Sequence, residues 1–139
     1  MLIQVVIITF ILLELSNVLA LYFAPGSKLA NAVGVFKAWE QSKQYPEIHE
    51  FVKYLVNWVA GAKLIFLSLL AIIVLYGDVE QQRLSLLALA LTTASFYWRL
   101  FPLIRKMGQN GQVEPKNYAT VLGVIILVFI VAFIGAAIF

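Results

Sequence analysis

Glu14 and Lys63 are the two charged residues that lie deep inside long apolar stretches, in "ILLELSNVLAL" and "NWVAGAKLIFL". A charged side chain at the middle of a bilayer costs at least ~2.5–3.5 kcal/mol, so it usually faces the bundle interior and has a partner. Glu14 lies 11 residues before Pro25, and Lys63 lies 10 residues after Lys53. At the rise of an α-helix these separations are about 16 and about 15 Å from one membrane boundary. The spacing therefore predicts that the two charges meet between adjacent antiparallel helices.

Other polar residues fall at positions from which they could join this pair. Asn17 lies one helical turn after Glu14, Asn57 precedes Lys63 on the second apolar stretch, and Thr93 lies in the third beside Thr92 and Ser95. We expect a mid-membrane site that binds or transports a small apolar or cationic molecule, or a proton, whose residues are Glu14, Asn17, Asn57, Lys63 and Thr93. Glu14 would be the ionisable group and Lys63 its counter-charge. In the alternative interpretation the charges only fix the register of two helices, and the asparagines are interhelical hydrogen-bonding residues.

The composition indicates that the bilayer is the solvent of this chain. Of its 139 residues, 63% are hydrophobic and 12% are charged, with a mean hydropathy of +0.94. Soluble domains have about a quarter charged residues. Four apolar segments are long enough to span a bilayer as helices, at residues 1–24, 54–76, 84–101 and 118–139. We therefore predict an all-α integral membrane protein, with residues 1–139 forming one compact four-helix bundle.

The distribution of basic residues predicts the orientation of the bundle. The first and third connections share one side of the membrane, and eight Lys and Arg residues lie in or beside them, against Arg83 alone in the second. The positive-inside rule puts connections 25–53 and 102–117 in the cytoplasm and both termini outside. A bacterial-type inner membrane is the expected location.

The first connection has the apolar spacing of a short helix. Leu29, Val33, Phe36 and Trp39 recur at helical intervals, which predicts an amphipathic helix lying at the membrane interface after the first span. Packing of the same helix against the end of the bundle is an equally good interpretation. Pro46 then suits the first turn of the helix that continues into the second span.

No pattern in the sequence indicates catalysis, a cofactor or a metal. The chain has no Cys and no hydrolase or phosphate-loop motif, and its single histidine, His49, stands beside Glu47 and Glu50 as an expected solvated helix cap. A dispersed net charge of +3 gives no reason to expect a nucleic-acid partner. We expect a protein that is not an enzyme. An enzyme acting on lipid or isoprenoid through Arg99, Arg105 and Trp39 is one alternative.

A second alternative is a non-catalytic subunit or assembly factor of a larger membrane complex. Four spans enclose only a small pore or pocket, so we expect a homo-oligomer or a larger assembly in the lipid bilayer. The stretch around Glu14 also resembles the first helix of the small multidrug resistance transporters, in which a lone glutamate exchanges protons for cationic drugs. The resemblance implies that role for Glu14. Outside about a dozen residues the chain departs from that pattern, in its length, its extended first connection and Lys63, so no family membership is inferred.

Overall fold

Four helical stretches in the computed structural model, which describes residues 1–139, are long and apolar enough to cross a membrane. They are Leu2–Phe23, Pro46–Tyr76, Val79–Gln109 and Tyr118–Ile138. The chain forms no β-strand. The prediction of an all-helical chain with four apolar helices is therefore confirmed, and these helices indicate an integral membrane protein.

The elements in chain order are six helices and one 3₁₀ turn: α1 (Leu2–Phe23), η1 (Val33–Val35), α2 (Lys37–Ser42), α3 (Pro46–Tyr76), α4 (Val79–Ala94), α5 (Phe96–Gln109) and α6 (Tyr118–Ile138). Pro46 occupies the first turn of α3, where its missing N–H is not needed. Asp78 begins α4 with a capping box, in which its carboxylate accepts a hydrogen bond from the Gln81 backbone N–H at 2.8 Å. Only Gly77 and Asp78 separate α3 from α4, so these helices are joined by a tight turn.

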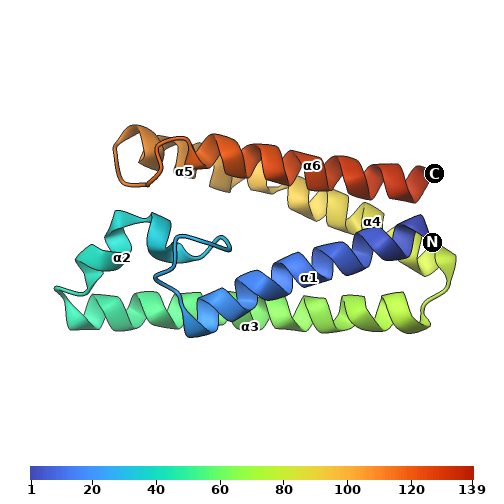
Figure 1. Cartoon of the computed structure of the whole chain (residues 1–139), viewed down its shortest axis with the longest axis horizontal. Coiled ribbons are helices and arrows are strands. Elements are labelled where there is room, and N and C mark those ends of the chain that lie inside the picture. The colour runs from blue at the N-terminus through green and yellow to red at the C-terminus, as the bar shows by residue number, and fades with distance from the viewer.

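The long helices form two pairs that converge at one end of the molecule (Figure 1). Helix α1 packs along α3, and α4 packs along α6. Met1, Phe139 and the α3–α4 turn lie at the same end, which we call the terminal end; the opposite end carries residues 24–45 and 110–117 and is called the loop end. At the terminal end a buried cluster draws on all four helices: Ile7, Phe10, Leu70, Val74, Leu86, Ala90, Phe133, Ala136 and Ala137. The two pairs are therefore packed together at this end.

At the loop end the two connections between helices are joined to each other. Phe36 and Val113 form an antiparallel bridge, with the Lys37 N–H donating to the Gln112 carbonyl at 3.0 Å. Lys28 and Lys37 flank the Glu114 carboxylate, at 3.2 and 3.5 Å. The hydrogen bond and charge of Lys28, followed by the charge of Lys37, hold the pKa of the Glu114 carboxyl below its usual value. The connections thus tie one helix pair to the other.

The amphipathic helix that we predicted after the first span is not formed as such. Residues 28–31 are turns and bends, η1 follows, and α2 is only six residues long. Gly34 explains part of this, because its Cα lies so close to the preceding turn that an added Cβ would stand 2.0 Å from the Gly26 carbonyl oxygen. Trp39 is buried, at 7% exposed, in a cluster with residues of α1 and α3. This segment therefore folds against the helices, which favours our second interpretation of it.

The third helical stretch also extends beyond the predicted range of 84–101. It begins at Val79 and reaches Gln109, with an interruption at Ser95 rather than at Pro102. The Ser95 hydroxyl donates to the Thr92 carbonyl at 2.6 Å and its N–H donates to the same carbonyl at 3.1 Å, which replaces regular α-helical pairing there. Pro102 lies inside α5. The stretch is thus divided into α4 and an amphipathic α5.

Candidate functional site

Lys63 lies directly beside Glu14, as the comparison of depths predicted. Its Nζ is 2.7 Å from Glu14 Oε2 and also donates a hydrogen bond to Asn17 Oδ1. The two charged side chains are 21% and 23% exposed. The pair joins α1 to α3 within the apolar part of both helices, and its charges neutralise each other.

Asn17 connects this ion pair to the first connection. Its amide Nδ2 donates to the carbonyl oxygens of Ala30 and Asn31, at 2.6 and 3.0 Å, while its Oδ1 accepts from Lys63. Ala30 and Asn31 both have φ of +53°, a left-handed conformation that residues other than glycine rarely adopt. The Asn31 side chain in turn accepts a hydrogen bond from the Tyr118 hydroxyl on α6. A chain of hydrogen bonds therefore runs from α3 through α1 and the connection to α6.

The ion pair lines a cavity between the two helix pairs. The cavity has a volume of about 650 Å³, and 17 of its 24 lining residues are hydrophobic. Its boundary toward the terminal end is formed by Phe10, Phe66 and Phe129. The Phe10 ring stacks on Phe66 and meets Phe129 edge to face. Residues of the first connection line it toward the loop end: Asn31, Val33 and Phe36. The cavity is thus an apolar space with one polar region.

Thr92, Thr93 and Ser95 add hydroxyl groups to the lining. The Thr92 hydroxyl donates to the Ala88 carbonyl at 2.8 Å, and the Ser95 hydroxyl is bonded within its own helix as well. The half-buried Thr93 hydroxyl forms no hydrogen bond within the chain. Thr93 therefore presents a free donor and acceptor to the cavity.

Four of the five predicted site residues line this cavity, namely Glu14, Asn17, Lys63 and Thr93. The structure does not bring Asn57 to them. Asn57 is exposed, and the cavity is lined by its neighbours Val56 and Val59. Six residues of α-helix separate Asn57 from Lys63, which turns the two side chains about 120° apart.

The prediction omitted the contribution of α5, although the sequence carries a signal for it. Leu100, Leu103, Ile104 and Met107 all line the cavity. They follow the i, i+3, i+4, i+7 spacing of one helical face, which is a recognisable amphipathic pattern. We had interpreted this segment as the end of a short span followed by a loop, and so did not assign its apolar face to the site.

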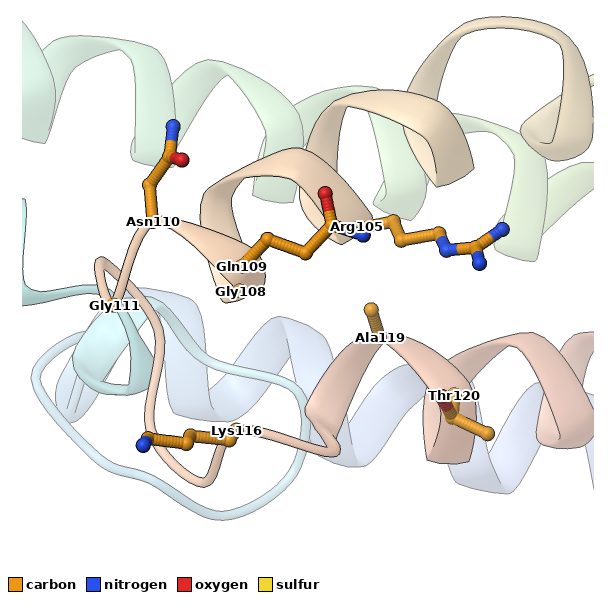
Figure 2. A pocket seen from close by; sticks show the side chains of 8 residues that line it. All are labelled: Arg105, Gly108, Gln109, Asn110, Gly111, Lys116, Ala119 and Thr120. Carbon is orange, nitrogen blue, oxygen red and sulfur yellow. The ribbon is translucent and has the colours of Figure 1, made fainter.

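A second cavity, of about 550 Å³, lies at the loop end between the end of α5 and the start of α6 (Figure 2). Its lining includes two basic residues, Arg105 and Lys116. Figure 2 shows that these two side chains point in opposite directions from the backbone. They do not converge on one position.

The three residues that the lipid-enzyme alternative would use do not lie together in either cavity. Trp39 is buried against α1 and α3, Arg99 lies over the Trp98 ring at 5.0 Å, and Arg105 lines the second cavity. No group of three side chains suited to hold a metal ion is present. His49 shares a 2.8 Å hydrogen bond with Ser42 and lies against the Trp39 ring, so it is half-buried rather than a solvated cap.

Comparison of the chain with protein-family models, with curated proteins and with solved structures yields no match.

Proposed function

We propose that this chain binds a small molecule in the cavity lined by Glu14 and Lys63. The observation that carries the proposal is that the ion pair opens onto a large cavity. A pair that served only to fix the register of α1 and α3 would need no such space beside it. The volume of about 650 Å³ lies within the range of roughly 300–1,000 Å³ that is typical of sites for small ligands.

The lining of the cavity supports the same proposal. Most ligand sites are largely apolar and carry a few polar groups that orient the ligand. Here the apolar walls come from α3, α5 and α6, and the polar groups include Glu14, Asn17, Lys63 and Thr93. The binding function uses this space, whereas Arg99, Arg105 and Trp39, the residues of the enzyme alternative, do not line it.

We also propose that the loop end faces the cytoplasm. The eight basic residues in or beside the first and third connections, against one in the α3–α4 turn, support this orientation through the positive-inside rule. Both termini would then lie outside, in a bacterial-type inner membrane. In this arrangement the ion pair lies about 16 Å from the cytoplasmic boundary, near the middle of the bilayer.

Photolabelling tests the binding function. The chain is reconstituted in phosphatidylcholine nanodiscs and irradiated with an octanol that carries a diazirine, and the labelled residues are located by peptide mass spectrometry. We expect saturable labelling of cavity residues, because the cavity concentrates the probe beyond its level in lipid. Unlabelled octanol should compete for these positions and leave the labelling of lipid-facing residues unchanged.

A matched pair of substitutions controls for non-specific labelling. Val59 lines the cavity and is 50% exposed, whereas Val131 on α6 is 62% exposed and does not line it. Val59→Trp should occupy part of the cavity and weaken the saturable labelling, while Val131→Trp should leave it intact. Labelling that is equal in both variants, or that never saturates, would contradict the proposed function.

A further inference from the structure

We infer that the ligand is an uncharged amphiphile that enters from the bilayer between α3 and α5 and places a hydroxyl or carbonyl head at Glu14, Lys63 and Thr93. This inference rests on the proposed binding function and specifies its ligand class. Three observations carry it: the side on which the cavity is open, the charge balance of its polar region, and its volume.

The cavity is open on the side between α3 and α5. Leu55 and Val59 on α3, and Leu100 and Leu103 on α5, line the cavity and are nevertheless 37–59% exposed. Helix α3 packs on α1, α2 and α4, and α5 packs on α4 and α6, so packed helices do not close this side. The terminal end is closed by the buried cluster that all four helices share, and the first connection covers the loop end. A ligand dissolved in the bilayer can therefore reach the cavity directly through the side between α3 and α5.

The charges in the polar region favour an uncharged head. Glu14 and Lys63 are the only charged residues that line the cavity, and they are paired with each other. A charged ligand would place a third charge in an apolar space where both possible counter-ions are already bound, which is costly.

The same region offers hydrogen bonds to an uncharged head. Lys63 uses two of its three N–H donors, on Glu14 and Asn17, and the second carboxylate oxygen of Glu14 forms no hydrogen bond within the chain. The Thr93 hydroxyl is also free, as described above. A ligand hydroxyl can donate to Glu14 and accept from Lys63 or Thr93, and a carbonyl can accept from either donor. The polar region is therefore suited to a neutral group that forms hydrogen bonds.

The volume limits the size of the ligand. A cavity of about 650 Å³ holds roughly 20 non-hydrogen atoms at about 30 Å³ each. A single alkyl or isoprenoid chain with a small head fits this limit, whereas a two-chain phospholipid does not. The expected class is a single-chain lipid alcohol, ester or ketone.

Three photoreactive probes test this inference in the same nanodiscs. They share a twelve-carbon chain with a diazirine at one position and differ only in the head, which is a hydroxyl, a carboxylate or a trimethylammonium group. We expect the alcohol to label cavity residues at least tenfold more strongly than either charged probe. A charged probe that labels the cavity as strongly as the alcohol would overturn the ligand class while leaving the binding function in place. Saturable cavity labelling by none of the three would overturn the binding function itself.

A second comparison tests the position of the head. Thr93→Val removes the free hydroxyl with almost no change in shape, and Thr9→Val makes the same change at an exposed residue of α1 that does not line the cavity. The half-saturating concentration of the alcohol probe should rise three- to tenfold in the first variant and be unchanged in the second. Equal behaviour of the two variants would overturn the placement of the head at Thr93.

Discussion

The contributions of Glu14 and Lys63 to the free energy of unfolding should depend strongly on each other. Lys63→Met removes the donor to Glu14 and to Asn17, and it leaves a carboxylate without its counter-charge. Removing one partner of a buried ion pair costs about 3–5 kcal/mol. Because each side chain is about one-fifth exposed, we expect a value at the lower end of this range, about 3 kcal/mol.

The other arms of a double-mutant cycle have smaller expected costs. Glu14→Gln keeps a carbonyl that can accept from Lys63, but it leaves the ammonium without its counter-charge, so it should cost about 2 kcal/mol. The double variant has no uncompensated charge and should cost about 1.5 kcal/mol, well below the sum of about 5 kcal/mol for the two single variants. The coupling energy is then about 3.5 kcal/mol.

The cycle is measured by unfolding each variant with SDS in mixed micelles and recording the loss of helical circular dichroism. Lys43 and Glu40 provide the control, because they form a pair at a similar distance, 2.8 Å, on the surface, with side chains 49% and 67% exposed. Their coupling should be below about 0.5 kcal/mol. If the Glu14–Lys63 costs are additive, or if Lys63→Met is as mild as Lys43→Met, the two charges do not depend on each other as the structure indicates.

Two further predictions concern the loop end. Gly34→Ala places a methyl group 2.0 Å from a backbone oxygen and should lower the thermal midpoint of unfolding by several degrees. The control Gly135→Ala adds a methyl group that meets nothing within 4 Å and should leave the midpoint unchanged. Equal midpoints in the two variants would show that the close approach at Gly34 does not constrain the fold. Because Lys28 and Lys37 lower the pKa of Glu114, its ion pairs stabilise the junction of the connections above the usual carboxyl pKa and are lost as pH falls through the lowered value. After correction for the pH dependence of intrinsic amide exchange, the protection of the bridge between the connections should therefore fall in acid and in high salt in the native chain, and Glu114→Gln should remove both dependences. A corrected pH profile in that variant that matches the native chain would refute the assignment.

The features that the sequence predicted well are those that depend on local spacing. Apolar length identifies the four helices, and counting residues from Pro25 and Lys53 places Glu14 and Lys63 at one depth because the helical rise is constant. Asn57 does not lie with the other predicted site residues, because depth alone does not specify which face of a helix a residue occupies. Adding the helical rotation between Asn57 and Lys63 would have separated them.

The conformation of the first connection is not determined by local spacing. The left-handed backbone at Ala30 and Asn31 is held by hydrogen bonds from Asn17, and the Phe36–Val113 bridge joins parts of the chain that are distant in sequence. Leu29 and Trp39 have the spacing of a common helical face, yet Leu29 is 77% exposed and Trp39 is buried. Tertiary hydrogen bonds therefore override the helical pattern in this segment.

Asn17 explains why the polar region and the first connection behave as one unit. Its position requires a side chain that accepts a hydrogen bond from Lys63 and donates two more to the carbonyls of Ala30 and Asn31. Among side chains of this size only an amide supplies both functions, since a carboxylate has no donor and a hydroxyl has a single one. The left-handed conformation costs about 1–2 kcal/mol at Ala30, which the amide hydrogen bond helps to offset. The same amide therefore bonds to both Lys63 and the first connection, which lines the cavity toward the loop end.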